Sequence, residues 1–263
     1  MMREEELLYL VDQATRMILG ANHMIGIGGA GMSVESGVRP FRGPGGLWAE
    51  RGEPDMLGYQ RFLNDPKGWW EARLERQKQS SPEDGARREA QPNPGHYALA
   101  ELEEMGLLKH LITQNVDNLH LAAGSKSVTE IHGNMYKMRC ISCHTRFDRD
   151  RFEVKEIPPR CPHCGGIVKS DGVMFGEPIP PYALRRSQEE TMKCDCMLLL
   201  GTSGVVYPTA GFPIIAKQRG ATIIEVNLYE TDLSLICDLS IRSPAGAVLP
   251  RLVERTKKLQ TQL

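Results

Sequence analysis

The sequence lacks an apolar run of about 18 residues or more, the length that a transmembrane helix requires. It also lacks the positively charged start of a signal peptide, because residues 1–6 read MMREEE. Neither sign of charge is in excess, since 32 Lys and Arg residues stand against 33 Asp and Glu residues. Nucleic-acid binders usually carry a basic excess, so a polyanionic partner is not expected. These absences predict a near-neutral soluble enzyme of the cytoplasm that binds neither membrane nor nucleic acid.

Seven cysteines are present, and four of them have the spacing of a metal site rather than of a disulfide framework. They form two C-x2-C pairs separated by seventeen residues, which can converge tetrahedrally on one zinc ion and leave no position open for chemistry. Zinc is therefore expected to be structural, and the reactive residues must lie elsewhere. His144 and His163 are competing ligands, but an adjacent histidine is more often a surface group or a partner of a ligand. The predicted zinc ligands are Cys140, Cys143, Cys161 and Cys164.

The other three cysteines are Cys194, Cys196 and Cys237, and each lies in or beside an apolar run. Free cysteine is among the most buried residue types, so we expect buried thiols rather than redox groups. This usage suits a reducing compartment.

Apolar runs that end in glycine or polar residues alternate with helical patterns along the chain. Short apolar runs predict buried strands, and apolar residues at helical spacing predict amphipathic helices. Residues 41–58 are predicted to be a long loop, and residues 80–94 a polar, mobile connection. Strands are predicted at 23–27, 111–113, 197–200 and 222–226, and helices at 4–19, 66–79, 96–105 and 210–219.

This alternation predicts an α/β fold with a doubly wound parallel, Rossmann-like sheet and a smaller zinc-ribbon plus helical module. The Rossmann-like domain is predicted to comprise residues 1–41, 96–134 and 178–263. The cofactor loop and helical module would span 42–95, and the zinc-binding module 135–177.

Ligands of such sheets bind beyond the carboxyl ends of the strands, and three glycine-rich or polar segments follow predicted strands here. Residues 26–31 read G-x-G-x-x-G, a weak signal alone, whose glycines would let the backbone approach a pyrophosphate. Residues 201–203 (GTS) and Asn227 offer hydroxyl and amide groups to phosphate or ribose. Together they predict a site for an extended dinucleotide. No acidic residue ends a strand about 20 positions after the glycines, so an ordinary hydride-transfer enzyme is poorly supported.

The string TQNVDNLH at 113–120 packs amide, carboxylate and imidazole groups directly behind an apolar strand. One interpretation is structural, with Asn115 or Asp117 capping a helix. In its sequence context, however, the string resembles the sirtuin family of NAD-dependent protein deacylases. The resemblance extends over about residues 26–227, in the family's order and spacing. Its other motifs are the glycine-rich segment up to residue 48, EIHGN at 130–134, both cysteine pairs, FGE at 175–177 and GTSGVVYP at 201–208.

The resemblance implies that NAD is cleaved between nicotinamide and ribose, and that the acyl group of a modified lysine is transferred to ADP-ribose. His132 would be the general base, a role that suits imidazole because its unperturbed pKa lies near working pH. Asn115 and Asp117 would assist catalysis, with the Asp117 carboxylate accepting from the nicotinamide amide. Zinc would take no part in the reaction.

The resemblance also implies the residues that bind each substrate. NAD would contact Gly29, Ala30, Gly31, Ser33, Val38, Phe41, Arg42, Gln114, Asn115, Val116, Asp117, His132, Gly201, Thr202, Ser203 and Asn227. The acylated peptide would insert as a strand between two segments, with main-chain bonds giving affinity. These segments contribute Val173, Phe175, Gly176, Glu177, Gly204, Val205 and Val206.

The chain departs from the family pattern beside the glycines. Residues 38–42 read VRPFR where the family usually has Ile-Pro-Asp-Phe-Arg, and Gly28 replaces a common threonine. The missing aspartate puts NAD affinity and rate in question. Arginines but no tyrosine occupy 70–76, the stretch corresponding to Tyr-x-x-Arg of members that remove dicarboxylic acyl groups, so uncharged groups are expected.

Two other functions are possible. A sirtuin-like ADP-ribosyltransferase or NAD hydrolase would use the same pocket with another acceptor, but His132 favours deacylation. A non-catalytic zinc-ribbon binding protein would use the basic residues between 137 and 160. Acidic residues interleave with these, which indicates a solvated mixed surface.

Overall fold

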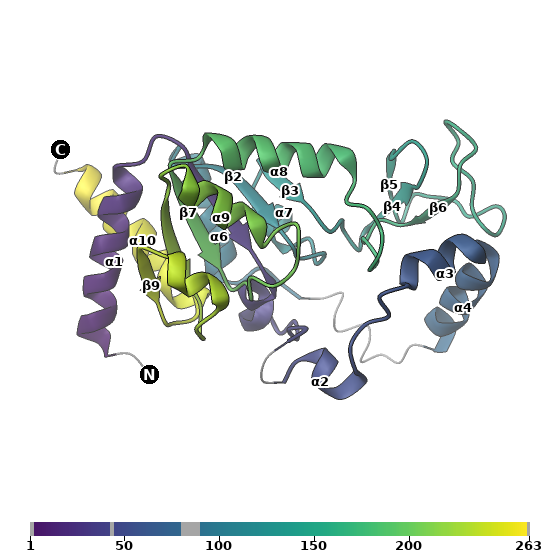
Figure 1. Ribbon diagram of the computed structural model, residues 1–263, viewed down its shortest axis with the longest axis horizontal. Helices are drawn as coiled ribbons and strands as arrows, with labels where there is room; N and C mark the ends of the chain where they lie inside the picture. Colours follow the sequence, from purple (N-terminus) through teal and green to yellow (C-terminus); the bar gives the residue numbers. More distant parts are fainter. Residues whose placement is uncertain (1–2, 43–44, 80–89, 262–263) are drawn as a thin grey trace.

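The protein is described by a computed structural model that covers residues 3–42, 45–79 and 90–261. Within the predicted mobile connection 80–94, residues 80–89 therefore lie outside the described residues. The rest forms a large sheet domain at one end and a smaller module at the other, with α1 and α10 at the sheet domain's outer side (Figure 1). None of the described helices is long and apolar enough to cross a membrane.

Six parallel strands form the main sheet in the order β3-β2-β1-β7-β8-β9. The central strands are buried on both faces, as their continuous apolar runs predict. The parallel doubly wound sheet is thus confirmed. The strands are β1 (Met24–Gly28), β2 (Leu108–Thr113), β3 (Val128–Glu130), β7 (Cys196–Leu200), β8 (Thr222–Val226) and β9 (Leu239–Ile241).

Helices cover both faces of this sheet. α1 (Glu4–Leu19), α6 (Pro94–Glu104) and α10 (Ala245–Gln260) share a hydrophobic cluster with side chains of one face. α8 (Pro181–Lys193) and α9 (Gly211–Gln218) contribute to the cluster on the other face. Strand residues alternate between the two clusters because successive side chains point to opposite faces.

The smaller module combines an antiparallel three-stranded sheet with a pair of helices. Its strands are β4 (Lys137–Cys140), β5 (Arg146–Asp148) and β6 (Val168–Ser170), and its helices are α3 (Gly58–Asn64) and α4 (Pro66–Gln79). Trp70 of α4 is buried against this sheet and donates its indole N–H to the carbonyl of Val168 at 3.0 Å. The two parts therefore share one small core. The predicted division into three segments stays a prediction.

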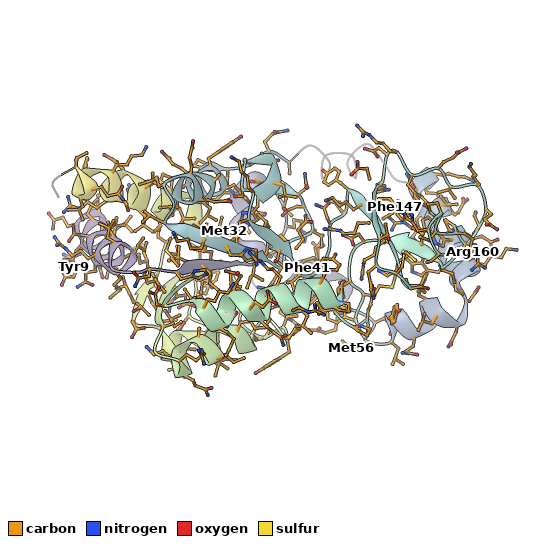
Figure 2. The ribbon with its side chains drawn as sticks, turned by 90° about the horizontal axis from the view of Figure 1, so that it is seen from above. Tyr9, Met32, Phe41, Met56, Phe147 and Arg160 are labelled. Carbon is orange, nitrogen blue, oxygen red and sulfur yellow. The ribbon has the colours of Figure 1, made fainter. Side chains whose placement is uncertain are left out.

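Some local predictions were wrong. The loop predicted at 41–58 contains the short helix α2 (Leu47–Arg51). No element was predicted for the segment after the glycines, which forms a 3-10 helix, η1 (Ala30–Ser36). Cys194 and Cys196 are buried as predicted, whereas Cys237 is only partly buried. α7 (Leu119–Ala122) and η2 (Asp232–Ile236) are further short helices. From above, Phe41 lies between the sheet domain and the end of the small module that carries Arg160 (Figure 2).

Candidate active site

A cavity of about 1570 Å³ opens at the carboxyl ends of β1, β2, β7 and β8. It exceeds the roughly 300–1,000 Å³ of ordinary small-molecule pockets, so it has room for more than one substrate. Its walls include residues 29–31, 114–116, 201–203 and 227, which are the segments that follow these strands. The polar segments that were predicted to follow strands therefore meet around one cavity.

The glycines after β1 pack against the loop after β7. Gly31 donates its N–H to the carbonyl of Gly201 at 2.8 Å. A Cβ on Gly31 would lie 2.6 Å from the Cα of Gly201, and one on Gly29 would lie 2.7 Å from its carbonyl oxygen. The glycines are thus needed for contact between two loops, in addition to any approach of a ligand.

Buried polar groups lie directly behind the glycine loop. The Asn115 amide, only 7% exposed, donates to the carbonyl of Gly29 and to the hydroxyl of Ser33, both at 3.0 Å. Ser33 donates in turn to Asp117 at 2.7 Å, and the other carboxylate oxygen of Asp117 accepts from the N–H of Leu119. Asp117 therefore has part of the structural role considered above, because its carboxylate accepts from the first backbone N–H of α7.

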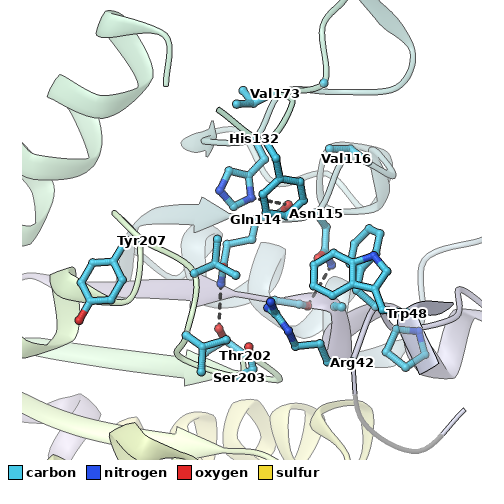
Figure 3. Close-up of a pocket in the computed structure, with 18 of the residues that line it drawn as sticks. Arg42, Trp48, Gln114, Asn115, Val116, His132, Val173, Thr202, Ser203 and Tyr207 are labelled. Carbon is cyan, nitrogen blue, oxygen red and sulfur yellow. Dashed lines mark hydrogen bonds between the residues drawn. The ribbon is translucent and has the colours of Figure 1, made fainter. Parts of the chain in front are cut away.

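His132 follows β3 and lines the cavity, half-buried. Its Nδ1 lies 3.3 Å from the carbonyl oxygen of Gln114 (Figure 3). A carbonyl only accepts, so Nδ1 carries the proton of the neutral ring and Nε2 keeps a free lone pair. Burial lowers the pKa of His132 below 6.5, although the bond to Gln114 acts in the opposite direction. The ring is thus held as a neutral base at neutral pH.

The opposite wall of the site is a chain of side-chain amides and hydroxyls. Gln114 donates to the hydroxyl of Thr202 at 2.8 Å (Figure 3). The amide of Asn227 donates to the carbonyl of Thr202 at 2.8 Å. These bonds connect the ends of β2, β7 and β8. They leave the oxygen of the Asn227 amide and the hydroxyl of Ser203 as groups that could meet a ribose or phosphate.

Aromatic rings form the cavity wall nearest the small module. Trp48 lies between Phe41 and Phe175, with ring centroids 5.4 and 5.7 Å apart, and the Arg42 guanidinium lies 4.3 Å from its ring centre. Trp48 ends the glycine-rich motif, but its residue type and position predicted no role for it. Arg39, which stands where the family usually has proline, pairs with Glu50 at 2.9 Å, and Pro40 stands where the family has aspartate.

The predicted peptide segments lie on either side of the cavity, one from 173–177 and one from 204–206. The N–H of Val173 donates to the carbonyl of His132 at 2.9 Å. Glu177 is buried, and its carboxylate pairs with Arg139 and Lys169. Its side chain is therefore engaged within the protein.

Most of the predicted site residues line the cavity. Four do not, namely Ser33 and Asp117 behind Asn115, and Val38 and Gly204 at the edges. Further lining residues, for which no role was predicted, come from the segments after β7 and β8 and from the helical module. They include Trp48, Arg61, Trp69, Arg76, Tyr207, Leu228, Tyr229, Glu230 and Asp232.

The four predicted zinc ligands converge at the far side of the small module. Their sulfur atoms lie within 4.8 Å of one another, and the pairs Cys140–Cys164 and Cys143–Cys161 are 3.5 and 3.7 Å apart. A tetrahedral zinc site with bonds of about 2.3 Å would separate its sulfurs by about 3.8 Å. The cluster therefore fits zinc. His163 stacks on Phe147 instead, with ring centroids 5.9 Å apart.

Comparison with known proteins agrees with this architecture. The model of the Sir2 family matches residues 29–208. The chain belongs to the Sir2 family. NAD-dependent protein deacylase 2 of Pyrobaculum aerophilum is 45% identical to this sirtuin over 92% of this chain and 94% of its own length. The corresponding deacylase of Thermococcus kodakarensis is 41% identical over 96% and 98%.

Solved structures of Sir2 proteins have the same fold as this sirtuin. A Sir2 homologue in complex with ADP-ribose has a TM-score of 0.80 and 39% identity, covering 95% of this chain and 98% of that chain. A Sir2 homologue–NAD complex has a TM-score of 0.78 at 39% identity, with 94% of both chains covered. A Sir2 complex with a deacetylated p53 peptide and acetyl ADP-ribose scores 0.76 at 30% identity, covering 93% and 97%.

The cysteine cluster predicts about one zinc ion per chain, and Cys140→Ala should abolish its binding because a three-thiolate site is open and weaker. Metal analysis by mass spectrometry would measure this. Cys196→Ala, which removes a buried thiol of the main sheet, is the matched control and should retain the metal. Full zinc content in Cys140→Ala would contradict the assignment.

Proposed function

We propose that this sirtuin is an NAD-dependent protein lysine deacylase that transfers the acyl group from lysine to ADP-ribose and releases nicotinamide. The observation that carries the proposal is His132, a neutral imidazole whose Nδ1 is bonded to a carbonyl and whose other nitrogen is free to accept a proton in the cavity. NAD, when bound, supplies the ribose carbon that receives the acyl oxygen.

His132 acts as the general base for a ribose hydroxyl in this proposal. The Gln114 carbonyl keeps the Nδ1 proton in place, so a proton taken up at Nε2 produces an imidazolium that the same carbonyl stabilises. Gln114 also orients the Thr202 hydroxyl, and it would thereby position the ribose relative to the base.

The proposed nicotinamide pocket is formed by Ala30, Val38, Phe41, Asn115, Val116 and Asp117. Ser33 joins Asn115 to Asp117 through its hydroxyl. Their mutual hydrogen bonds pre-organise the pocket before any ligand arrives. Asn115 lines the cavity, whereas Asp117 lies behind it and accepts from Ser33. Direct acceptance from the carboxamide by Asp117 stays a prediction, for which the carboxylate keeps further acceptor sites.

The other predicted contacts complete the proposed binding mode. Arg42 and the glycine backbone would hold the diphosphate, because a guanidinium matches phosphate geometry. Thr202 and Ser203 would hold the phosphate side, and Asn227 the adenosine ribose. Gln114 and Asn115 would hold the nicotinamide ribose. The acylated peptide would lie between 173–177 and 204–206, adding a strand by main-chain bonds.

The names of the relatives and the ligands in the solved Sir2 structures support this proposal. Those compared above are named NAD-dependent protein deacylases, and the solved Sir2 structures hold ADP-ribose, NAD or a deacetylated peptide with acetyl ADP-ribose. A cytoplasmic location and the absence of a nucleic-acid partner stay predictions, supported by the near-neutral charge and by the metal spacing of the cysteines.

Incubation with NAD and an acetyl-lysine peptide should yield O-acetyl-ADP-ribose, nicotinamide and free lysine peptide. His132→Ala should lower the rate by about 10²- to 10⁴-fold, because the base that deprotonates the ribose hydroxyl is lost. Mass spectrometry of the products measures both. His23→Ala, which removes a histidine that pairs with Glu190 at 2.7 Å outside the cavity lining, should retain activity.

The same assay separates the alternatives. ADP-ribosylated protein as the main product would identify a transferase, and free ADP-ribose without peptide conversion would identify an NAD hydrolase. No product of any kind would favour the non-catalytic zinc-ribbon protein.

Activity should fall in acid as His132 becomes protonated and loses its free lone pair. Because burial lowers the pKa of His132, the acid limb of kcat/KM should have its midpoint below pH 6.5, the ordinary value. A profile measured at saturating peptide and limiting NAD would show it. A midpoint above 6.5 in the wild type, or one that moves in His23→Ala, would contradict this origin.

Uncharged acyl groups should be removed in preference to dicarboxylic ones. Trp69 gives the cavity an apolar surface near α4, and the Arg61 guanidinium already pairs with Asp55 at 3.0 Å. The tyrosine of the Tyr-x-x-Arg pattern is also absent from 70–76, so kcat/KM should favour acetyl-lysine by about 10-fold or more. Competition between matched acetyl and succinyl peptides measures the ratio, and preference for succinyl would refute this expectation.

A further inference from the structure

Six charged side chains meet in the interior between the small module and the turn that carries His132. Three are cationic and three are anionic, and they are joined by ion pairs of 2.5 to 3.1 Å. Four of them, Arg139, Lys169, Asp171 and Glu177, have side chains at most 4% exposed. The remaining two are Glu130 and Arg146.

Asp171 is the member that touches the His132 turn directly. Its carboxylate accepts the backbone N–H of Asn134 at 2.8 Å, two residues after His132. Gly133 between them has φ +80°, and a Cβ there would lie 2.2 Å from the carbonyl oxygen of Asp171. The turn and residue 171 are therefore in close contact through both main chain and side chain.

Asp171 is also the point where the zinc-binding strands connect to the proposed peptide segment. It follows β6 directly, and its own N–H donates to the carbonyl of Lys137 on β4. Two residues later, the N–H of Val173 donates to the carbonyl of His132 at 2.9 Å. A displacement of Asp171 would thus move both the base and the edge of the peptide segment.

The charged partners hold Asp171 from the side of the small module. Arg139 of β4 places its Nε 3.1 Å from one carboxylate oxygen, and Arg146 of β5 bonds the other. Arg139 also bonds Glu177 at 2.8 Å, and Glu177 accepts from the N–H of Met174 at 2.8 Å. The Arg139 Nε contact is an ion pair without hydrogen-bond geometry, but the same guanidinium also donates to the backbone carbonyl of Asp171 at 3.1 Å. Removal of one partner of a buried ion pair is costly, so loss of the Asp171 charge should disturb this contact.

We propose that Asp171 is a positioning residue for deacylation, which sets the place of His132 by clamping its turn to β4 and β5. The strands of the zinc-binding module would then affect the reaction rate only by fixing the position of this carboxylate. The metal itself would not contact the reactants. The inference rests on the proposed function of His132.

Asp171→Asn tests this inference, because asparagine keeps the size of the side chain and one acceptor but loses the charge that two arginines hold. We expect kcat to fall about 10- to 100-fold through displacement of the base, with the KM for NAD within about twofold of wild type. Zinc content should stay unchanged. In histidine side-chain NMR, the His132 signal, assigned with His132→Asn, should move.

Glu190→Gln is the matched control. Glu190 is an equally buried carboxylate, 3% exposed, paired with Arg186 and Lys193 on α8, and it lies outside the cavity lining. It should change thermal stability while leaving kcat and the His132 signal as in wild type. Equal effects of both variants on kcat, or an unmoved His132 signal in Asp171→Asn, would overturn the proposal.

If Asp171→Asn fails to fold or loses zinc, Arg146→Gln tests the same proposal. Arg146 is 22% exposed at the edge of the network and bonds both Glu130 and Asp171. It should give the same pattern in kcat and NMR, to a smaller degree, and a wild-type pattern would count against the proposal. A wild type without deacylase activity would refute the proposed function alone, since the NMR comparison does not depend on turnover.

Discussion

The parallel direction of six strands brings the polar loops of this protein to one edge of one sheet. Because β1, β2, β7 and β8 point the same way, the segments after them meet around a single cavity. Contact between the loops after β1 and β7 is possible only because Gly29, Gly31 and Gly201 have no side chains in the way. The amide, hydroxyl and imidazole groups of the site depend on that close approach.

The site is organised by internal hydrogen bonds before any substrate is present. The Gln114 carbonyl selects the tautomer of His132, and the Gln114 side-chain amide positions the Thr202 hydroxyl. One residue therefore orients groups that follow two different strands, β3 and β7. Ser33 joins Asn115 to Asp117 in the same way. Such pre-organisation lowers the cost of arranging polar groups around a reacting bond.

The small module contributes support rather than reactive groups. Its four cysteines lie together away from the cavity, while its buried arginines and lysine face the segment that leads to the proposed peptide site. The ring of Phe175 contacts that of Trp48 in α2, before the helical pair. The zinc-binding strands, the peptide segment and the loop over the cavity are therefore connected by contacts of different kinds.

The sequence by itself determined the features that depend on local pattern: the four central strands, the helices α1, α4, α6 and α9, and the convergence of four cysteines. The helices α8 and α10 were not predicted. Apolar runs and C-x2-C spacing carry that information within a few residues. Only the tertiary structure decided the short β3 and β9, which exist through pairing with β2 and β8, and α2, which lies within a segment predicted to be a loop. It also decided that Asp117 bonds Ser33 and that Glu177 is buried among cations, because hydrogen-bond partners far apart in the chain are chosen by packing.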